Sequence, residues 1–212
     1  MDLLENILLQ PSYFSPIAQY AAILQSNHVC FEVADHFQKQ TYRTRCYIYS
    51  PNGKQLLNVP IQHAKNGKKT KTKDVKIDYL TAPWKKIHLK SLQAGYRSSP
   101  FYEYYEDDLT AVLQKNHLYL YDLLLDVHEF IMEALEEKCE FTTTQTFDKQ
   151  VFEKKDLRNL VNAKEASTLQ FPNYVQMFDK RHGFLENLSV LDLLFMEGPA
   201  AGIYLRKIDF SK

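Results

Sequence analysis

The first residues of the chain show apolar and polar positions arranged as a strand, a turn, a helix and a second strand. A continuous apolar run at 6–9 ends before a proline and predicts a buried strand. A turn bracketed by prolines follows at 11–16, with Ser15 as the predicted N-cap, and apolar residues then recur at helical spacing over 17–24. Residues 29–33 predict the second strand. This is a unit of the βαβ kind, in which the turn after the first strand is the usual ligand site.

The apolar period changes to two between residues 43 and 61. Two alternating runs are joined by the turn 51–54, which contains Asn-Gly, and this arrangement is a strong signal for a β-hairpin. The polar segment 63–73, called the lysine loop below, holds five lysines. It is expected to be a mobile connection that contributes little to stability. A short strand is predicted at 75–77.

Amphipathic patterns in the middle of the chain predict three helices, and one more helix is expected near its end. The first two cover 84–92 and 101–113, and the third and longest covers 118–135. A threonine-rich segment at 141–145 predicts a strand. The apolar run at 189–196 predicts a late buried helix.

Together these elements predict an α/β fold. It has an N-terminal strand–turn–helix–strand unit, a central β-hairpin, a helical middle region and a C-terminal helix packing on the sheet. The sequence shows no internal repeat and no linker composition, so residues 1–212 are expected to form a single domain.

Composition narrows the functional classes. Of the 212 residues, 45% are hydrophobic and 25% are charged, which excludes a disordered chain, and the formal net charge of zero argues against general nucleic-acid binding. No run reaches the roughly 18 apolar residues that a transmembrane segment needs. The acidic segment 1–9 has no basic residue and does not resemble a signal peptide. Cys30, Cys46 and Cys139 are expected to be reduced thiols in a cytoplasmic protein.

Several common chemical motifs are missing from the sequence. With six glycines, the chain spells neither GxGxxG nor a Walker A loop, and it has no GxSxG elbow. It also has no CxxC and no HExxH, so no metal site is expected and any cofactor is left unknown. His117 and Asp122 have the HxxxxD spacing of some membrane-linked acyltransferases. The alternative is a helix histidine and a solvent-facing aspartate.

Charge is sorted along the chain. Residues 38–97 hold 14 lysines and arginines against 2 acids, a net of +12, whereas residues 103–140 hold 11 acids against 2 lysines, a net of −9. One interpretation is two solvated faces of opposite charge. The other is a basic cleft for an anionic ligand. Arg43 and Arg45 favour the cleft, because residues two apart in a strand point the same way and arginine pairs well with phosphate.

Several motifs, in order along nearly the whole chain, resemble the WbqC-like protein family. The first is Leu-Gln-Pro-Ser-Tyr-Phe-Ser-Pro at 9–16, followed by an aromatic at Tyr20. Near the C-terminus, residues 187–194 and then Glu197-Gly198 fit the closing motif of the family. The matches between them are Gln40–Arg45, Gly53, Leu57–Pro60, Asp74–Ile77, Trp84, His88, Tyr96 and Ser99–Phe101. One departure is Ser15, where many members have proline.

The resemblance implies a bacterial cytoplasmic protein, of a kind often encoded among surface-polysaccharide genes, and it brings no settled reaction. The leading hypothesis is a transferase of O-antigen-type polysaccharide biosynthesis that acts on an activated sugar or small acid. Its expected partner is an anionic small molecule such as a nucleotide-sugar. The alternative from another class is a non-catalytic sugar-binding or scaffold subunit of a biosynthetic complex.

A weaker resemblance keeps a third class open. The order of strand, turn with Phe14-x-Pro16, and helix looks like the first motif of nucleotidylyltransferases. Those enzymes place histidines in this turn and on the helix, and this chain has none there. In such an enzyme, the helix N-terminus and Arg45 would have to stabilise the phosphate instead.

Seven residues are expected to bind the ligand, and five of them lie between residues 10 and 45. Gln10 ends the first predicted strand and offers amide hydrogen bonds at its carboxyl end. Tyr13 and Tyr42 would stack on, or hydrogen-bond to, a base or a sugar. Arg43 and Arg45 would hold a phosphate.

The other two residues expected to bind the ligand are Trp84 and Asp192, and His88 completes the predicted site. His88 is the catalytic candidate, as a general base, and the nearby Trp84 is expected to contact the ligand. Asp192 interrupts an otherwise apolar run, and a buried aspartate needs a partner. Arg45 is the hypothesised partner.

Overall fold

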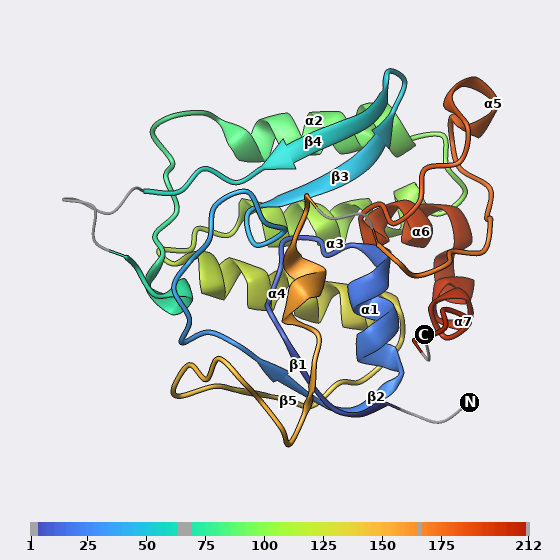
Figure 1. Cartoon of the computed structure of the whole chain (residues 1–212). Coiled ribbons are helices and arrows are strands. Elements are labelled where there is room, and N and C mark those ends of the chain that lie inside the picture. The colour runs from blue at the N-terminus through green and yellow to red at the C-terminus, as the bar shows by residue number, and fades with distance from the viewer. Residues whose placement is uncertain (1–3, 63–68, 165–166, 211–212) are drawn as a thin grey trace.

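The computed structural model describes residues 4–62, 69–164 and 167–210. Its larger β-sheet has four parallel strands in the order β5-β2-β1-β6, of which β5, β2 and β1 are labelled in Figure 1. These strands are β1 (Leu4–Leu9), β2 (Ser26–Phe31), β5 (Phe141–Thr143) and β6 (Lys155–Asp156). Because all four run in one direction, their carboxyl ends lie at the same edge, which we call the carboxyl edge. Helix α1 (Ile17–Leu24) connects β1 to β2, which confirms the predicted βαβ-type unit.

The predicted β-hairpin is confirmed as a separate two-stranded sheet. Strands β3 (Arg45–Ser50) and β4 (Gly53–Asn58) pair in antiparallel register, with Ser50 opposite Gly53. The loop between them is therefore Pro51 and Asn52 alone. Gly53 has a φ of 95°, a backbone conformation that favours glycine.

The helical elements confirm the mixed α/β class. The longer helices are α2 (Trp84–Tyr96), α3 (Tyr102–Gln114), α4 (Leu120–Ala134) and α6 (Val190–Glu197), and the shorter elements are η2 (Thr72–Asp74), η3 (Arg158–Val161), α5 (Asp179–His182), η4 (Gly198–Ala200) and α7 (Ala201–Leu205). All four helices predicted after the hairpin are present. The late helix α6 packs against α1, α3 and the hairpin strand β3.

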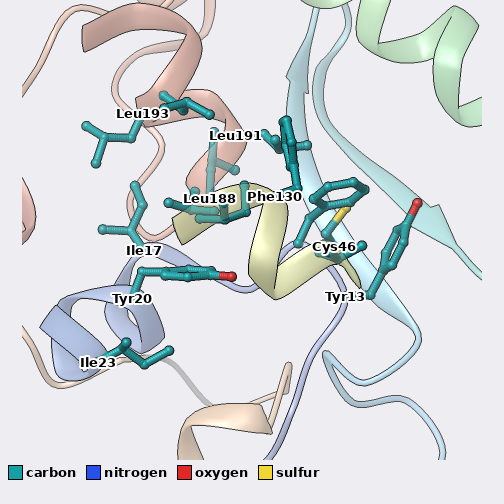
Figure 2. Close-up of a cluster of buried hydrophobic side chains, with 14 of the residues drawn as sticks. Tyr13, Ile17, Tyr20, Ile23, Cys46, Phe130, Leu188, Leu191 and Leu193 are labelled. Carbon is teal, nitrogen blue, oxygen red and sulfur yellow. The ribbon is translucent and has the colours of Figure 1, made fainter. Parts of the chain in front are cut away.

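The core forms where helices from distant parts of the sequence meet the hairpin. Figure 2 shows Leu191 of α6 between Ile17 of α1 and Phe130 of α4, with Cys46 of β3 next to Phe130. All four side chains are buried. In α1, seven of the eight residues are buried, so this helix lies wholly inside the molecule rather than on its surface.

The amino end of α1 is closed by a segment from the opposite end of the chain. Ile17 N donates a hydrogen bond to Leu188 O over 3.0 Å, and Ala18 N donates to Asn187 Oδ1 over 2.9 Å. A helix N-terminus binds an anion through free N–H groups, and these two are already bonded. This corrects the expectation that the end of this helix could stabilise a phosphate.

The predicted cap of α1 is also displaced by one residue. Pro16 occupies the N-cap position, and its side chain has no hydrogen-bonding group. Ser15 Oγ instead donates to Ser12 O over 3.3 Å, inside the buried turn. The side chain that caps α1 is instead that of Asn187, which lies 169 residues after Ala18 in sequence.

Replacing Asn187 with alanine is expected to lower the free energy of unfolding by about 1–2 kcal/mol, because the side-chain oxygen that caps α1 is lost. Asn187 has a φ of 51°, so alanine also strains the backbone. Asn187→Gly, which lacks the cap but accepts this φ, should be less destabilising than Asn187→Ala. Urea unfolding measures both, and wild-type stability of Asn187→Ala would contradict the capping role.

The structure differs from the sequence-based expectation in several short elements. Residues 75–77 form no strand, because isolated bridges alone pair Ile77 with Ile61 and Lys76 with Tyr119. Strand β6 and helices α5 and α7 were not predicted, since each has at most five residues and too few positions to show a period.

The lysine loop is described in part. Residues 63–68, on which much of the predicted mobility rests, lie outside the described residues. The remainder is held by backbone hydrogen bonds, from Thr72 N to Asp35 O and from Phe37 N to Thr70 O, each 2.9 Å long. This part of the loop therefore lies beside the carboxyl end of β2.

Candidate ligand-binding site

A cavity of about 620 Å³ lies at the carboxyl edge of the parallel sheet. It is lined by residues that follow three of the strands: Gln10 after β1, Asp35 after β2 and Arg158 after β6. Crevices outside the carboxyl ends of parallel strands are where open α/β sheets bind their ligands. The cationic side chains that line this carboxyl-edge cavity are Lys39, Arg43, Lys69, Arg158 and Lys164.

The centre of the carboxyl-edge cavity is a buried ion pair. Arg43 is 1% exposed, and its Nη2 donates to Asp35 Oδ2 over 2.6 Å. Arg43 Nε donates to Gln10 Oε1 over 3.2 Å, and Gln10 Nε2 donates to Asp35 Oδ2 over the same distance. Thr72 Oγ1 donates to Asp35 Oδ1 over 2.5 Å. The carboxylate therefore accepts three hydrogen bonds, and the guanidinium is fixed in a single orientation.

One donor of this guanidinium is left over. Arg43 Nη1 is buried and has no hydrogen-bond partner among the described residues. Burial lowers the pKa of Arg43, whereas the nearby Asp35 and Glu32 carboxylates raise it. A buried donor without a partner is costly, and a ligand oxygen at this position would remove that cost.

A second buried carboxylate, that of Glu32, connects segments that line the carboxyl-edge cavity. Glu32, 1% exposed, accepts hydrogen bonds from Ala34 N over 2.9 Å and from Asp35 N over 3.1 Å. Thr144 Oγ1 donates to it over 2.7 Å, and Arg158 Nη1 lies 3.4 Å from its other oxygen. Glu32 thus ties the segment after β2 to the ends of β5 and β6.

The arrangement is suited to binding an anion. Among the described lining residues, basic side chains outnumber acids, and the one acid, Asp35, is paired with Arg43. Electrostatic focusing by such a lining attracts phosphate or carboxylate groups. His36, an exposed lining residue, supplies an imidazole, the group that enzymes use most often for proton transfer.

The structure brings together, in the carboxyl-edge cavity, two of the seven residues predicted to bind ligand. Gln10 and Arg43 line the carboxyl-edge cavity, whereas Arg45 lines a neighbouring cavity of about 350 Å³ and Tyr42 lines another of about 260 Å³. The prediction that the two arginines point to the same side of one strand is wrong. Strand β3 begins at Arg45, and Arg43 lies in the preceding turn, so strand alternation does not relate them.

Tyr13, Trp84 and His88 form a separate buried cluster. Tyr13 Oη and His88 Nδ1 are 2.9 Å apart, and the Trp84 ring packs edge-on against both. All three side chains are at most 2% exposed, and they line none of the three cavities named above. Burial lowers the pKa of His88 to about 4, so its imidazole is neutral at pH 7. In this structure, His88 packs as a core residue.

Asp192 is satisfied by partners other than the predicted one. Its Oδ1 accepts from Tyr96 Oη over 2.6 Å, and its Oδ2 accepts from Tyr174 Oη over 2.6 Å and from Gln176 Nε2 over 2.9 Å. Burial raises its pKa, and these hydrogen bonds lower it. The hypothesis that Arg45 pairs with Asp192 is therefore wrong.

The HxxxxD spacing does not produce a catalytic pair either. His117 Nε2 lies 2.9 Å from Asp126 Oδ2, and Lys115 Nζ lies at the same distance from that oxygen. Asp122 is not the partner of His117. These residues form an ion-pair cluster that joins the loop after α3 to α4.

Sequence reasoning missed Asp35, His36 and Arg158 of the carboxyl-edge cavity. A signal for the first two was present, because both directly follow the predicted strand at 29–33. Applying the carboxyl-edge rule to the second strand as well as the first would have identified them. Arg158 had no such signal, because β6 has two residues and no recognisable pattern.

Within the described residues, no helix is both long enough and apolar enough to cross a bilayer, and no three His, Cys, Asp or Glu side chains converge as metal ligands would. A comparison with protein families matches residues 10–174 to the WbqC-like protein family, which covers more than half of the chain. No curated protein and no solved structure matches the chain.

Proposed function

This chain belongs to the WbqC-like protein family, and we propose that it is a transferase acting on an activated sugar or small acid. The proposed setting is bacterial surface-polysaccharide biosynthesis in the cytoplasm. Its ligand would be an anionic small molecule, such as a nucleotide-sugar, bound in the carboxyl-edge cavity.

The observation that carries the proposal is Arg43 Nη1. This donor is buried and has no partner in the part of the chain that the structure describes, on a guanidinium whose other groups are bonded to Asp35 and Gln10. A phosphate or carboxylate oxygen would satisfy it with a charge-assisted hydrogen bond. The exposed Lys39, Lys69 and Lys164 around the same cavity would add charge attraction for a ligand with more than one negative group.

The second candidate is a non-catalytic sugar-binding or scaffold subunit of a biosynthetic complex. The burial of His88 away from the cavities favours it, because the residue expected to act as general base contacts Tyr13 and Trp84 instead. Under this alternative, the same anionic ligand would bind and would be released unchanged.

The test is binding and turnover with UDP, with UDP-, GDP-, dTDP- and CMP-sugars, and with acetyl-coenzyme A. We expect at least one probe to raise the melting temperature, because a ligand that binds the native state alone stabilises it. The triple variant Lys39→Ala, Lys69→Ala, Lys164→Ala should bind that probe about tenfold more weakly, and its affinity should depend less on salt.

The matched control removes three exposed lysines elsewhere: Lys86→Ala, Lys90→Ala, Lys207→Ala. It should bind as the wild type does and should keep the wild-type salt dependence. Release of free nucleotide or free thiol would separate the transferase from the binding subunit. If none of the probes binds the wild-type protein, or if both triple variants bind equally, the proposed anion site is wrong.

A further inference from the structure

A smaller cavity of about 260 Å³ adjoins the carboxyl-edge cavity and has a different chemistry. The two share Asn159 and Asn162 among their lining residues. They are separated by the backbone pairing of the segment 41–42 with the segment 161–162, in which Tyr42 N donates to Val161 O over 2.9 Å. We call the smaller one the amide cavity.

The lining of the amide cavity is polar but almost uncharged. Three side-chain amides contribute to it, from Asn159, Asn162 and Asn187. The one charged group among its described lining residues, Lys155 Nζ, donates to Phe210 O over 3.2 Å. The carboxyl-edge cavity, by contrast, is lined by three lysines and two arginines.

Two of these amides are held in fixed orientations. Asn162 Oδ1 accepts from Lys164 N over 3.1 Å, and Asn187 Oδ1 accepts from Ala18 N over 2.9 Å. With the carbonyl group of each amide engaged, its NH2 group is the part that can donate to a ligand. The cavity thus offers preorganised neutral donors.

The walls between the amides are aromatic and apolar. Tyr42 and Phe210 are each 8% exposed and both line the cavity, together with Leu157 and Leu169. Apolar walls with a few placed polar groups are the usual construction of a small-molecule site. The cavity is smaller than the roughly 300–1,000 Å³ of a typical ligand pocket, which suits one part of a ligand rather than a whole one.

We propose that the amide cavity is a subsite for the uncharged, polyhydroxylated part of the ligand whose anionic part binds in the carboxyl-edge cavity. This inference rests on the proposed function and adds where the glycosyl group lies. Hydroxyl groups both donate and accept, so they match amides, and a sugar ring carries no charge that would need a counter-ion. Asn159 and Asn162, which line both cavities, would contact the ligand where the two parts join.

The test uses neutral probes that the cationic lining does not attract. Saturation-transfer NMR with methyl glucoside, methyl galactoside and methyl mannoside is expected to show binding of at least one of them to the wild-type protein. Thr168→Trp places a large side chain at an exposed lining position of the amide cavity, and it should abolish that signal. Gln93→Trp, on the exposed face of α2, is the matched control and should retain it.

A parallel titration with UDP keeps the two proposals apart. Thr168→Trp should bind UDP as the wild type does, whereas the Lys39, Lys69 and Lys164 triple variant should lose UDP affinity and keep the glycoside signal. If UDP binds but no glycoside does, or if Thr168→Trp keeps the signal, the subsite is wrong and the anion site stands. If a glycoside binds in the amide cavity but none of the anionic probes binds, the proposed function fails, and the amide cavity is a site for a neutral sugar alone.

Discussion

Replacing Arg43 with alanine is expected to lower the free energy of unfolding by about 3–5 kcal/mol, the usual cost of removing one partner of a buried ion pair. The cost arises because the substitution leaves the buried Asp35 carboxylate without its partner. Asp35 is 4% exposed, and without the guanidinium its carboxylate would keep hydrogen bonds from Gln10 and Thr72 but would lose the cation with which it is paired. Urea unfolding at pH 7 measures the change.

Two further variants separate the folding role of Arg43 from its binding role. In Arg43→Ala, Asp35→Asn no buried charge is left unpaired, so it should be more stable than the sum of the two single variants predicts. Arg43→Lys keeps a cation beside Asp35 but lacks the fixed fork of donors. It should therefore fold better than Arg43→Ala and still lose affinity for the anionic probe. A loss of less than about 1 kcal/mol in Arg43→Ala would show that the ion pair is not a major stabilising contact.

The elements that could be predicted are mostly those that the local pattern of apolar and polar residues determines. The apolar run at 6–9, the helical spacing at 17–24 and the Asn-Gly turn each reflect interactions among near neighbours in sequence, and each element is present. The elements that were missed depend on distant contacts. Strand β6 has two residues, and it exists because Leu157 N donates to Leu8 O and extends the edge of β1.

The candidate site also combines residues that the local sequence can locate with residues that only distant contacts bring together. Gln10 could be placed because the end of an apolar run marks the carboxyl end of a strand. The partners of Asp192 could not be predicted, because Tyr96 of α2 and the loop residues Tyr174 and Gln176 come from two segments that only the tertiary fold brings to Asp192. Arg43 was selected by a wrong geometric argument, since it lies before the strand on which it was placed.

Two buried histidines lead to the second large expectation, which concerns pH. Burial lowers the pKa of His88 and of His128 from 6.5 to about 4 in each case. His128 stacks on Tyr20, and its Nε2 is buried without a partner among the described residues. In the unfolded chain, both imidazoles would take up a proton near the ordinary histidine pKa of about 6.5. The folded protein resists that uptake until the pH approaches 4.

The sign of the effect follows from this difference. Between pH 6.5 and 4 the unfolded chain binds more protons than the folded one, so the free energy of unfolding falls as the pH falls. The full contribution is present above pH 6.5, and each histidine is expected to account for a loss of roughly 3 kcal/mol across the window. Asp192 changes the free energy of unfolding in the opposite direction. Burial raises its pKa, so the folded state holds the extra proton.

Urea unfolding at several pH values between 7 and 4 tests this expectation. His128→Phe keeps an aromatic ring beside Tyr20 and Phe31 but cannot be protonated, so it should remove about half of the pH dependence between 6.5 and 4. His182→Gln, at an exposed position, should leave the dependence unchanged. A wild-type stability that stays constant down to pH 4 would mean that His88 and His128 are not held neutral in the fold. The polar contacts of Tyr13 and Tyr20 with these rings would then have to include an imidazolium.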